Sequence, residues 1–149
     1  MIQNLGQLKN AHARFMREAE RAVNDVAEAA ANIGAQVAKS GLQSHVRTGR
    51  MLRSVRGSVA KLGKGRIVKL TNNVKYAPFF EFGTVPHPIV ARRAAFLRFR
   101  GRDGDIVFRK RVFHPGNKAF LVFAAAHERS SLFAGNALRL RMETVARTF

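Results

Sequence analysis

The first 43 residues carry apolar side chains at steps of three and four, which is the period of one helix face. The positions on this face are Leu5, Leu8, Phe15, Ala19, Val23, Val26, Ala30, Ile33 and Val37. Alanine is frequent between residues 27 and 35, where it favours helix and allows another element to approach closely. Gly41 is suited to the end of a helix. The pattern predicts one helix over 1–43, whose narrow apolar stripe packs on the chain's own sheet or on another subunit.

Residues 44–82 are predicted to form the core of a small sheet. Strand-like stretches cover Ser54–Leu62 and Arg66–Leu70. The sequence between them, Lys61–Gly65, has the glycines of a hairpin turn. A third strand is predicted over Tyr76–Phe82, where apolar side chains alternate.

Residues 83–117 are predicted to form an extended arm, because Pro86 and Pro88 interrupt regular structure. A second hairpin is expected within the arm, from Phe96–Arg100 and Ile106–Phe113 around a four-residue loop. That loop length gives the hairpin two unlike faces. Leu97, Phe99, Ile106 and Phe108 would form the apolar face, and Arg98, Arg100, Arg109 and Arg111 the cationic face.

The last segment, 118–147, has an imperfect apolar face with helical spacing, and Gly135 is a position at which that helix could kink or split. No internal repeat, low-complexity tract or linker is evident. We therefore predict a single α+β domain over 1–149. It should consist of a small antiparallel sheet of three to five strands, flanked by an N-terminal and a C-terminal helix, with the extended arm.

The net charge of +18, from 27 basic and 9 acidic residues, is distributed unevenly. Residues 1–43 hold five basic and four acidic residues, so the excess lies in residues 44–149. Most of the basic residues are arginine, which binds both carboxylate and phosphate in bidentate fashion. So basic a protein favours polyanions or acidic neighbours as partners, and nucleic acid is the usual inference.

The sequence contains no recognisable catalytic, metal or cofactor site. Its histidines have neither HxH nor HExxH spacing, there is no cysteine, and no GxSxG motif occurs. Gly57–Lys64 differs from a phosphate-binding loop by one extra residue between its glycines, and a hairpin turn explains it better. No segment approaches the roughly 20 apolar residues of a membrane span, and the N-terminus is unlike a signal peptide. We expect a soluble protein that folds in the cytoplasm, has no cofactor and is not an enzyme.

Glu81 is a carboxylate within an aromatic run and would be costly to bury alone. Arginines at 47, 50, 53 and 56 are three residues apart and would make one ridge if they were helical. Arg47 and Arg50 are therefore candidate partners of Glu81. The pair could form within one chain or between two subunits.

Three segments of the chain occur in a distinctive order: Val46–Val55 (VRTGRMLRSV), Tyr76–Thr84 (YAPFFEFGT) and Val112–Leu121 (VFHPGNKAFL). In order and spacing they resemble the HK97 gp10-like neck proteins of siphophages. Pro86, His87 and Ile89 also resemble the family, as does the stretch from Leu97 to Phe108. Asn117 and the Phe120 ending depart from the family's usual HPGTK…PFL, which leaves open where the last helix starts.

The resemblance implies a structural virion protein at the neck, where the DNA-filled head meets the tail, after assembly in the host cytoplasm. It also implies a homo-oligomeric ring, sixfold by the family's place in the connector. Its partners would be other connector, tail terminator or tail tube proteins, with genomic DNA touched only through non-specific backbone contacts. The alternatives are a tail terminator or tail-completion protein, and a free nucleic-acid-binding protein.

The hypothetical site residues follow from these arguments and form two groups. The proposed subunit or partner interface comprises Arg47, Arg50, Phe79, Glu81, Pro86, His87, His114, Pro115 and Gly116. The surface expected to face DNA or an acidic partner comprises Arg98, Arg100, Arg109 and Arg111.

Overall fold

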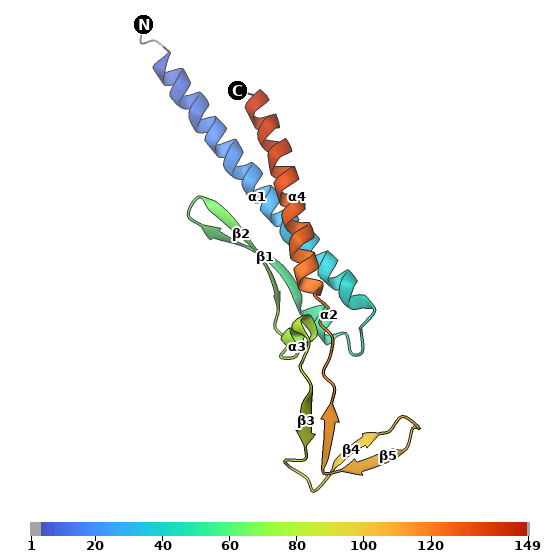
Figure 1. Ribbon diagram of the computed structural model, residues 1–149. Helices are drawn as coiled ribbons and strands as arrows, with labels where there is room; N and C mark the ends of the chain where they lie inside the picture. The colour runs from blue at the N-terminus through green and yellow to red at the C-terminus, as the bar shows by residue number, and fades with distance from the viewer. Residues whose placement is uncertain (1–3, 149) are drawn as a thin grey trace. The chain divides into compact units, whose positions relative to one another are not determined.

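The computed structural model describes residues 4–148 (Figure 1). The chain divides into two compact units. Unit 1 comprises Met1–Val74 and Val122–Phe149, and unit 2 comprises Lys75–Leu121. The α+β class, the long N-terminal helix and the C-terminal helix are as the sequence predicts. The strands are arranged in three separate two-stranded sheets.

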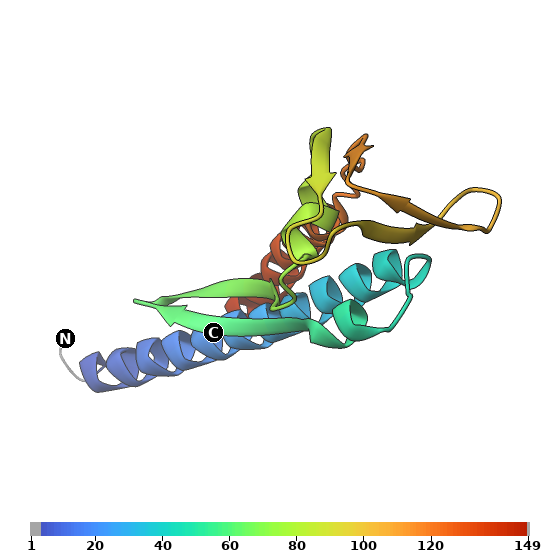
Figure 2. The ribbon, with the colours of Figure 1, turned by 90° about the horizontal axis from the view of Figure 1, so that it is seen from below.

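Unit 1 is built on the long helix α1 (Leu5–Gln43). The sequence predicted this helix over 1–43 with the same end, and residues 1–3 of that prediction lie outside the described residues. After the short helix α2 (Arg50–Ser54), strands β1 (Val55–Leu62) and β2 (Gly65–Asn72) form the predicted hairpin. The C-terminal helix α4 (Val122–Arg147) completes the unit without a break at Gly135. Figures 1 and 2 show the hairpin and α4 each lying alongside α1.

Small residues let the elements of unit 1 approach one another closely. A Cβ atom at Gly57 of β1 would lie 2.1 Å from the backbone oxygen of Ala31 in α1, so only glycine fits there. On the α4 side, the buried hydroxyl of Ser130 donates a 2.8 Å hydrogen bond to the carbonyl of Ala30. The alanine-rich part of α1 therefore forms the centre of the unit. The buried residues of α1 are Ala22, Val26, Ala27, Ala30, Ala31, Gly34, Ala38 and Leu42.

The beginning of α1 is different, because several of its large apolar side chains remain exposed. Leu5, Leu8 and Met16 are each about half exposed or more, and burial begins at Ala22. The predicted stripe is therefore exposed at Leu5 and Leu8, half-buried at Phe15 and Ala19, and fully packed on its own chain only over the C-terminal half of the helix. Both alternatives for that stripe, its own sheet and another subunit, are compatible with this division of the helix.

Unit 2 begins with the helix α3 (Ala77–Phe82), where the sequence had indicated a strand. That prediction was wrong because a short apolar run does not distinguish strand from helix. Two local signals favour the helix. Pro78 lies in the first turn, where its missing N–H costs nothing, and Gly83 ends the helix with a φ of 73°.

Two β-ribbons make up the rest of unit 2. Strand β3 (His87–Val90) pairs with β6 (Arg111–His114), and β4 (Leu97–Arg100) pairs with β5 (Ile106–Arg109). The predicted strand Ile106–Phe113 is thus divided at Lys110 between two ribbons, which point in different directions (Figure 1). The excursion expected over 83–95 contains strand β3 at its centre, which is one half of the β3–β6 ribbon.

Two further expectations are corrected by the local structure. The arginine ridge does not form, since α2 starts at Arg50 and Arg56 already belongs to β1. The last helix starts at Val122 and not at 118. It does not start earlier because Leu121 has a φ of 50°, which is outside the helical region, and the N–H groups of Phe120 and Leu121 donate to carbonyls of α3.

Candidate interaction surfaces

Two sequence motifs that lie 33 residues apart meet in unit 2. Thr84 and Asn117 exchange backbone hydrogen bonds of 3.0 and 3.1 Å, and the N–H of Asn117 also lies 3.0 Å from the hydroxyl oxygen of Thr84. We call this contact the crossing. It joins the EFGT segment to the HPGN segment and so closes the arm at its base. Neither residue was among the sequence-predicted site residues, although both lie in the motifs that carried the resemblance.

Glycine is required on both sides of the crossing. Gly83 has a φ of 73°, and a Cβ there would lie 2.5 Å from the oxygen of Asn117. Gly116 has a φ of 86°, and a Cβ there would lie 2.2 Å from the oxygen of Thr84. Real Cβ atoms do not approach a backbone oxygen so closely, and positive φ disfavours other residues as well. The glycines of the two motifs thus have a steric explanation within one chain.

The helix α3 is attached to the returning chain just beyond the crossing. The N–H groups of Phe120 and Leu121 donate to the carbonyls of Phe80 and Glu81 at 3.2 Å, and the rings of Phe80 and Phe120 stack with centroids 4.3 Å apart. These bonds satisfy carbonyls that the C-terminal end of a helix leaves unpaired. The Glu81 residue on this helix is only 6% exposed. The pairing of Glu81 with Arg47 or Arg50, both exposed in unit 1, stays a prediction.

Two predicted interface residues, His87 and His114, face each other across the β3–β6 ribbon. Their rings are stacked with centroids 5.2 Å apart. Nδ1 of His87 lies 2.9 Å from the carbonyl of Val85, and Nδ1 of His114 accepts the N–H of Gly116 at 3.0 Å. The histidines therefore stabilise the start of the ribbon and the turn into the crossing. Their role in an interface stays a prediction, as does that of the exposed Phe79, Pro86 and Pro115.

The β4–β5 hairpin lacks the two unlike faces that the sequence suggested. Five residues connect its strands, and the observed pairs are Leu97 with Arg109, Arg98 with Phe108, Phe99 with Val107 and Arg100 with Ile106. Side chains of directly paired residues lie on the same face, so a shift of one residue reverses the whole second strand. Each face consequently mixes arginine with apolar side chains.

The four arginines proposed to face DNA or an acidic partner are therefore distributed over two ribbons. Arg98 and Arg100 share one face of the hairpin, Arg109 lies on the other, and Arg111 belongs to β6. All four are exposed. The arm, residues 83–117, carries eight basic and two acidic residues, so it is cationic as a whole even though no single face collects the charge.

Within residues 4–148 no cluster of three or more histidine or acidic side chains is arranged to hold a metal ion. None of the helices described here combines the length and apolar character of a membrane span.

Comparison with known proteins gives one family. A family model described as "Bacteriophage HK97-gp10, putative tail-component" matches residues 4–83, more than half of the chain. The match covers the first two motifs as far as Gly83, whereas the HPGN segment lies outside it. No curated protein and no solved structure matched the chain. The chain belongs to the HK97 gp10-like family and is a structural component of a bacteriophage virion.

Proposed function

We propose that this protein is a ring-forming component of the neck, which joins the DNA-filled head to the tail. Membership of a phage tail-component family supports a role at this end of the virion. The sixfold symmetry of the ring is taken from the resemblance to neck proteins. Assembly in the host cytoplasm and contacts with other connector or tail proteins belong to the same proposal.

The observation that carries the proposal is the lack of a packed layer in unit 2. Within this unit, all of which lies in the described range, Ala77 and Glu81 are the buried residues. Phe82 is 75% and Phe113 is 70% exposed, and eleven more large apolar side chains between Tyr76 and Leu121 are also exposed. An isolated two-stranded ribbon is at best marginally stable in water. An arm of this kind is suited to lying on a neighbouring subunit.

A closed ring supplies such a neighbour to every arm. In a ring the contacts are heterologous, so the arm of one subunit meets a different surface of the next. The positive charge of unit 2 fits the same arrangement. The arm would face either the phosphates of DNA in the channel or acidic side chains of an adjoining protein.

The position in the virion can be tested by imaging particles from a phage that lacks this gene. For a neck component we expect full heads and complete tails that fail to join. Tails of irregular length would instead identify a tail terminator. A purified protein that remains monomeric and binds DNA with a steep salt dependence would favour a free nucleic-acid-binding protein.

The partner of the arm can be tested by replacing Arg98, Arg100, Arg109 and Arg111 together with glutamine. If these side chains line the channel, heads should lose packaged DNA more readily. For non-specific backbone binding, the salt slope of DNA binding should fall by about one for each phosphate that the variant no longer neutralises. If they dock on an acidic protein, heads should retain DNA but fail to join tails. Fully infectious particles would show that the four arginines are solvated and have no such role.

A further inference from the structure

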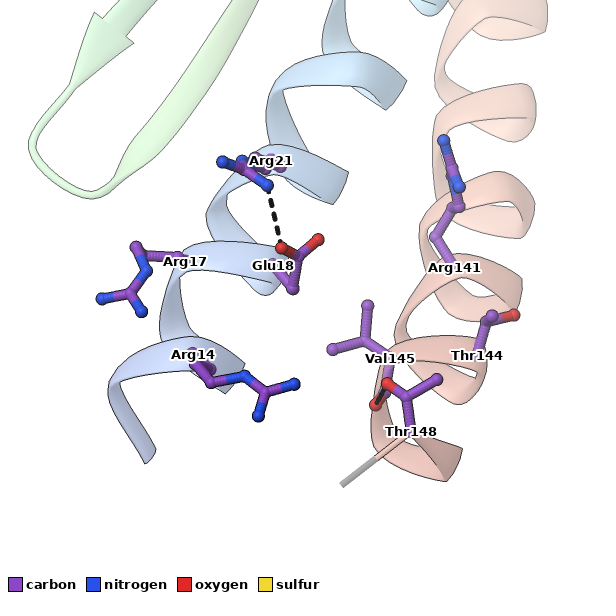
Figure 3. A pocket seen from close by; sticks show the side chains of 8 residues that line it. All are labelled: Arg14, Arg17, Glu18, Arg21, Arg141, Thr144, Val145 and Thr148. Atoms are coloured by element: carbon purple, nitrogen blue, oxygen red, sulfur yellow. Dashed lines mark hydrogen bonds and ion pairs between the residues drawn. The ribbon is translucent and has the colours of Figure 1, made fainter. Parts of the chain in front are cut away.

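A cleft of about 610 Å³ lies between the N-terminal half of α1 and the C-terminal end of α4, within unit 1. Four of its lining side chains are arginines, Arg14, Arg17 and Arg21 from α1 and Arg141 from α4, and one is a glutamate, Glu18. Figure 3 shows Arg14, Glu18, Val145 and Thr148 turned toward the space between the helices. The volume of the cleft is within the range of ligand-binding sites, roughly 300–1,000 Å³.

Two arginines of this cleft are held by exposed ion pairs. Arg21 contacts Glu18 at 2.9 Å, with side chains 71% and 47% exposed. Arg141 contacts Asp25 at 3.3 Å, with side chains 58% and 60% exposed. Exposed pairs of this kind contribute little to stability, so a bound anion can readily compete for the guanidinium groups. The lining of the cleft therefore has a net positive charge. The guanidinium groups of Arg21 and Arg141 are held in position only by weak, exposed ion pairs.

We propose that this cleft binds an acidic peptide segment, rich in Asp and Glu, of another protein. The planar guanidinium group of arginine can donate two parallel hydrogen bonds to one carboxylate. Val145 gives one wall of the cleft an apolar surface, against which the methylene groups of the peptide's acidic side chains can pack. A second hollow, of about 350 Å³, shares Arg17 with the cleft. It combines the apolar Met16, Val23 and Met142 with Lys61 and Lys64, and its one carboxylate, Glu20, is paired with Arg66. This lining suits a guest that carries apolar side chains among its acids.

Duplex DNA fits the cleft less well. Duplex DNA carries a negative charge about every 1.7 Å along its axis, so it binds best to a protein surface with a continuous row of basic side chains. Residues 1–43 hold four acidic against five basic residues, and Glu18 lies inside the cleft itself. A second copy of this chain also fits less well. The exposed acids of its unit 2 are Asp103 and Asp105, which stand among arginines, and four acids of its unit 1, Glu18, Glu20, Asp25 and Glu143, are already in ion pairs. Unit 1 alone forms the cleft, so peptide binding there does not depend on the position of the protein in the virion.

The first experiment is a titration of the whole protein with a short peptide of alternating Glu and Ala, observed through the methyl signals of Val145. We expect a saturable shift of these signals, and no shift with the matching Gln and Ala peptide. A Val145 methyl that does not respond to the acidic peptide would overturn the proposal. This titration needs no variant and therefore does not depend on how a variant folds.

The second experiment compares two triple variants that remove the same charge from unit 1. One replaces Arg14, Arg21 and Arg141 with glutamine, and the control replaces Lys39, Lys69 and Arg129, which are exposed and lie outside the cleft. Peptide affinity should fall by about tenfold or more in the first and much less in the control. Equal reductions in the two would show that net charge alone attracts the peptide, and would refute the site.

The remaining occupants are tested in the same assay. If duplex DNA displaces the peptide and shifts Val145 at lower concentration than the peptide does, the cleft is a nucleic-acid site and the proposal is wrong. It is also wrong if Val145 shifts with protein concentration alone and replacing Asp103 and Asp105 with asparagine abolishes that shift. That result would identify a second copy as the occupant.

Discussion

Replacing Gly116 with alanine tests the geometry of the crossing at the base of the arm. The added Cβ would lie 2.2 Å from the oxygen of Thr84 and 3.0 Å from the carbonyl carbon of Val85. Both are backbone atoms, so no side-chain rotation relieves the clash. The two chain segments at the crossing must separate, and the paired hydrogen bonds between Thr84 and Asn117 must lengthen or break.

Gly104 provides a matched control for the backbone conformation. Its φ of 88° is nearly that of Gly116, 86°, but nothing lies within 4 Å of a Cβ placed there. Alanine at either position should cost about 1–2 kcal/mol for the positive φ. The clash exists only at Gly116, where two backbone hydrogen bonds, each contributing about 0.5–1.5 kcal/mol net, would break. The strain at Gly104 lies in the turn between β4 and β5 and does not reach the crossing. At the crossing Gly116→Ala should therefore lose ~2–5 kcal/mol of local stability, which corresponds to ~30- to 5,000-fold in the population of the open form.

Hydrogen exchange of the amides of Thr84 and Asn117 measures that opening directly. Exchange at both amides should accelerate in Gly116→Ala and stay close to wild type in Gly104→Ala. Amides in the centre of α1, such as that of Ala30, serve as an internal reference in unit 1. If Gly116→Ala accelerates the two crossing amides no more than Gly104→Ala does, steric exclusion of a side chain does not explain this glycine.

Three further substitutions test other parts of the fold. Gly57→Ala should destabilise unit 1 by several kcal/mol, about the upper range for single substitutions, because its Cβ would lie 2.1 Å from the backbone oxygen of Ala31. Denaturant unfolding measures this loss, and the control Gly65→Ala, which has no neighbour under 3.4 Å, should change the denaturant midpoint far less. Ser130→Ala should cost about 0.5–1.5 kcal/mol in the same melt, because it removes one buried hydrogen bond to α1, and an unchanged midpoint would contradict that bond. Glu81→Gln should lower the free energy of unfolding by roughly 1–3 kcal/mol, because a carboxylate only 6% exposed needs a partner, and an amide pairs with that partner less well. Loss of oligomers in light scattering with an intact fold would place the partner on another subunit. No change in either measurement would contradict a paired Glu81.

Local signals in the sequence determined α1 and the β1–β2 hairpin. The helix follows from apolar spacing and alanine content over many turns, and the hairpin from alternation around a glycine-containing turn. Both patterns are repeated within the segment that folds, so they need no information from distant residues. The family resemblance likewise rested on local motifs, and the match over residues 4–83 confirmed it.

Register and pairing in the arm were decided only by the tertiary structure. The connection between β4 and β5 has five residues and not four. This difference of one residue puts Ile106 and Phe108 on the face of Arg98 and Arg100, and Arg109 on the face of Leu97 and Phe99. The pairing of β3 with β6 is also non-local, because its two strands are separated by the other hairpin. A pattern with a period of two does not contain that information.

The arginine cleft shows the same division between sequence and structure. Spacings of three and four place Arg14, Arg17 and Arg21 near one another on α1, which is readable from the sequence alone. That Arg141 joins them depends on how α4 packs on α1, which is fixed by small residues such as Ala30 and by the hydrogen bond from Ser130. The sequence therefore determined which side chains each helix presents. Only the packing of the two helices decided which of them share a site, because residues more than a hundred positions apart are brought together by shape and not by periodicity.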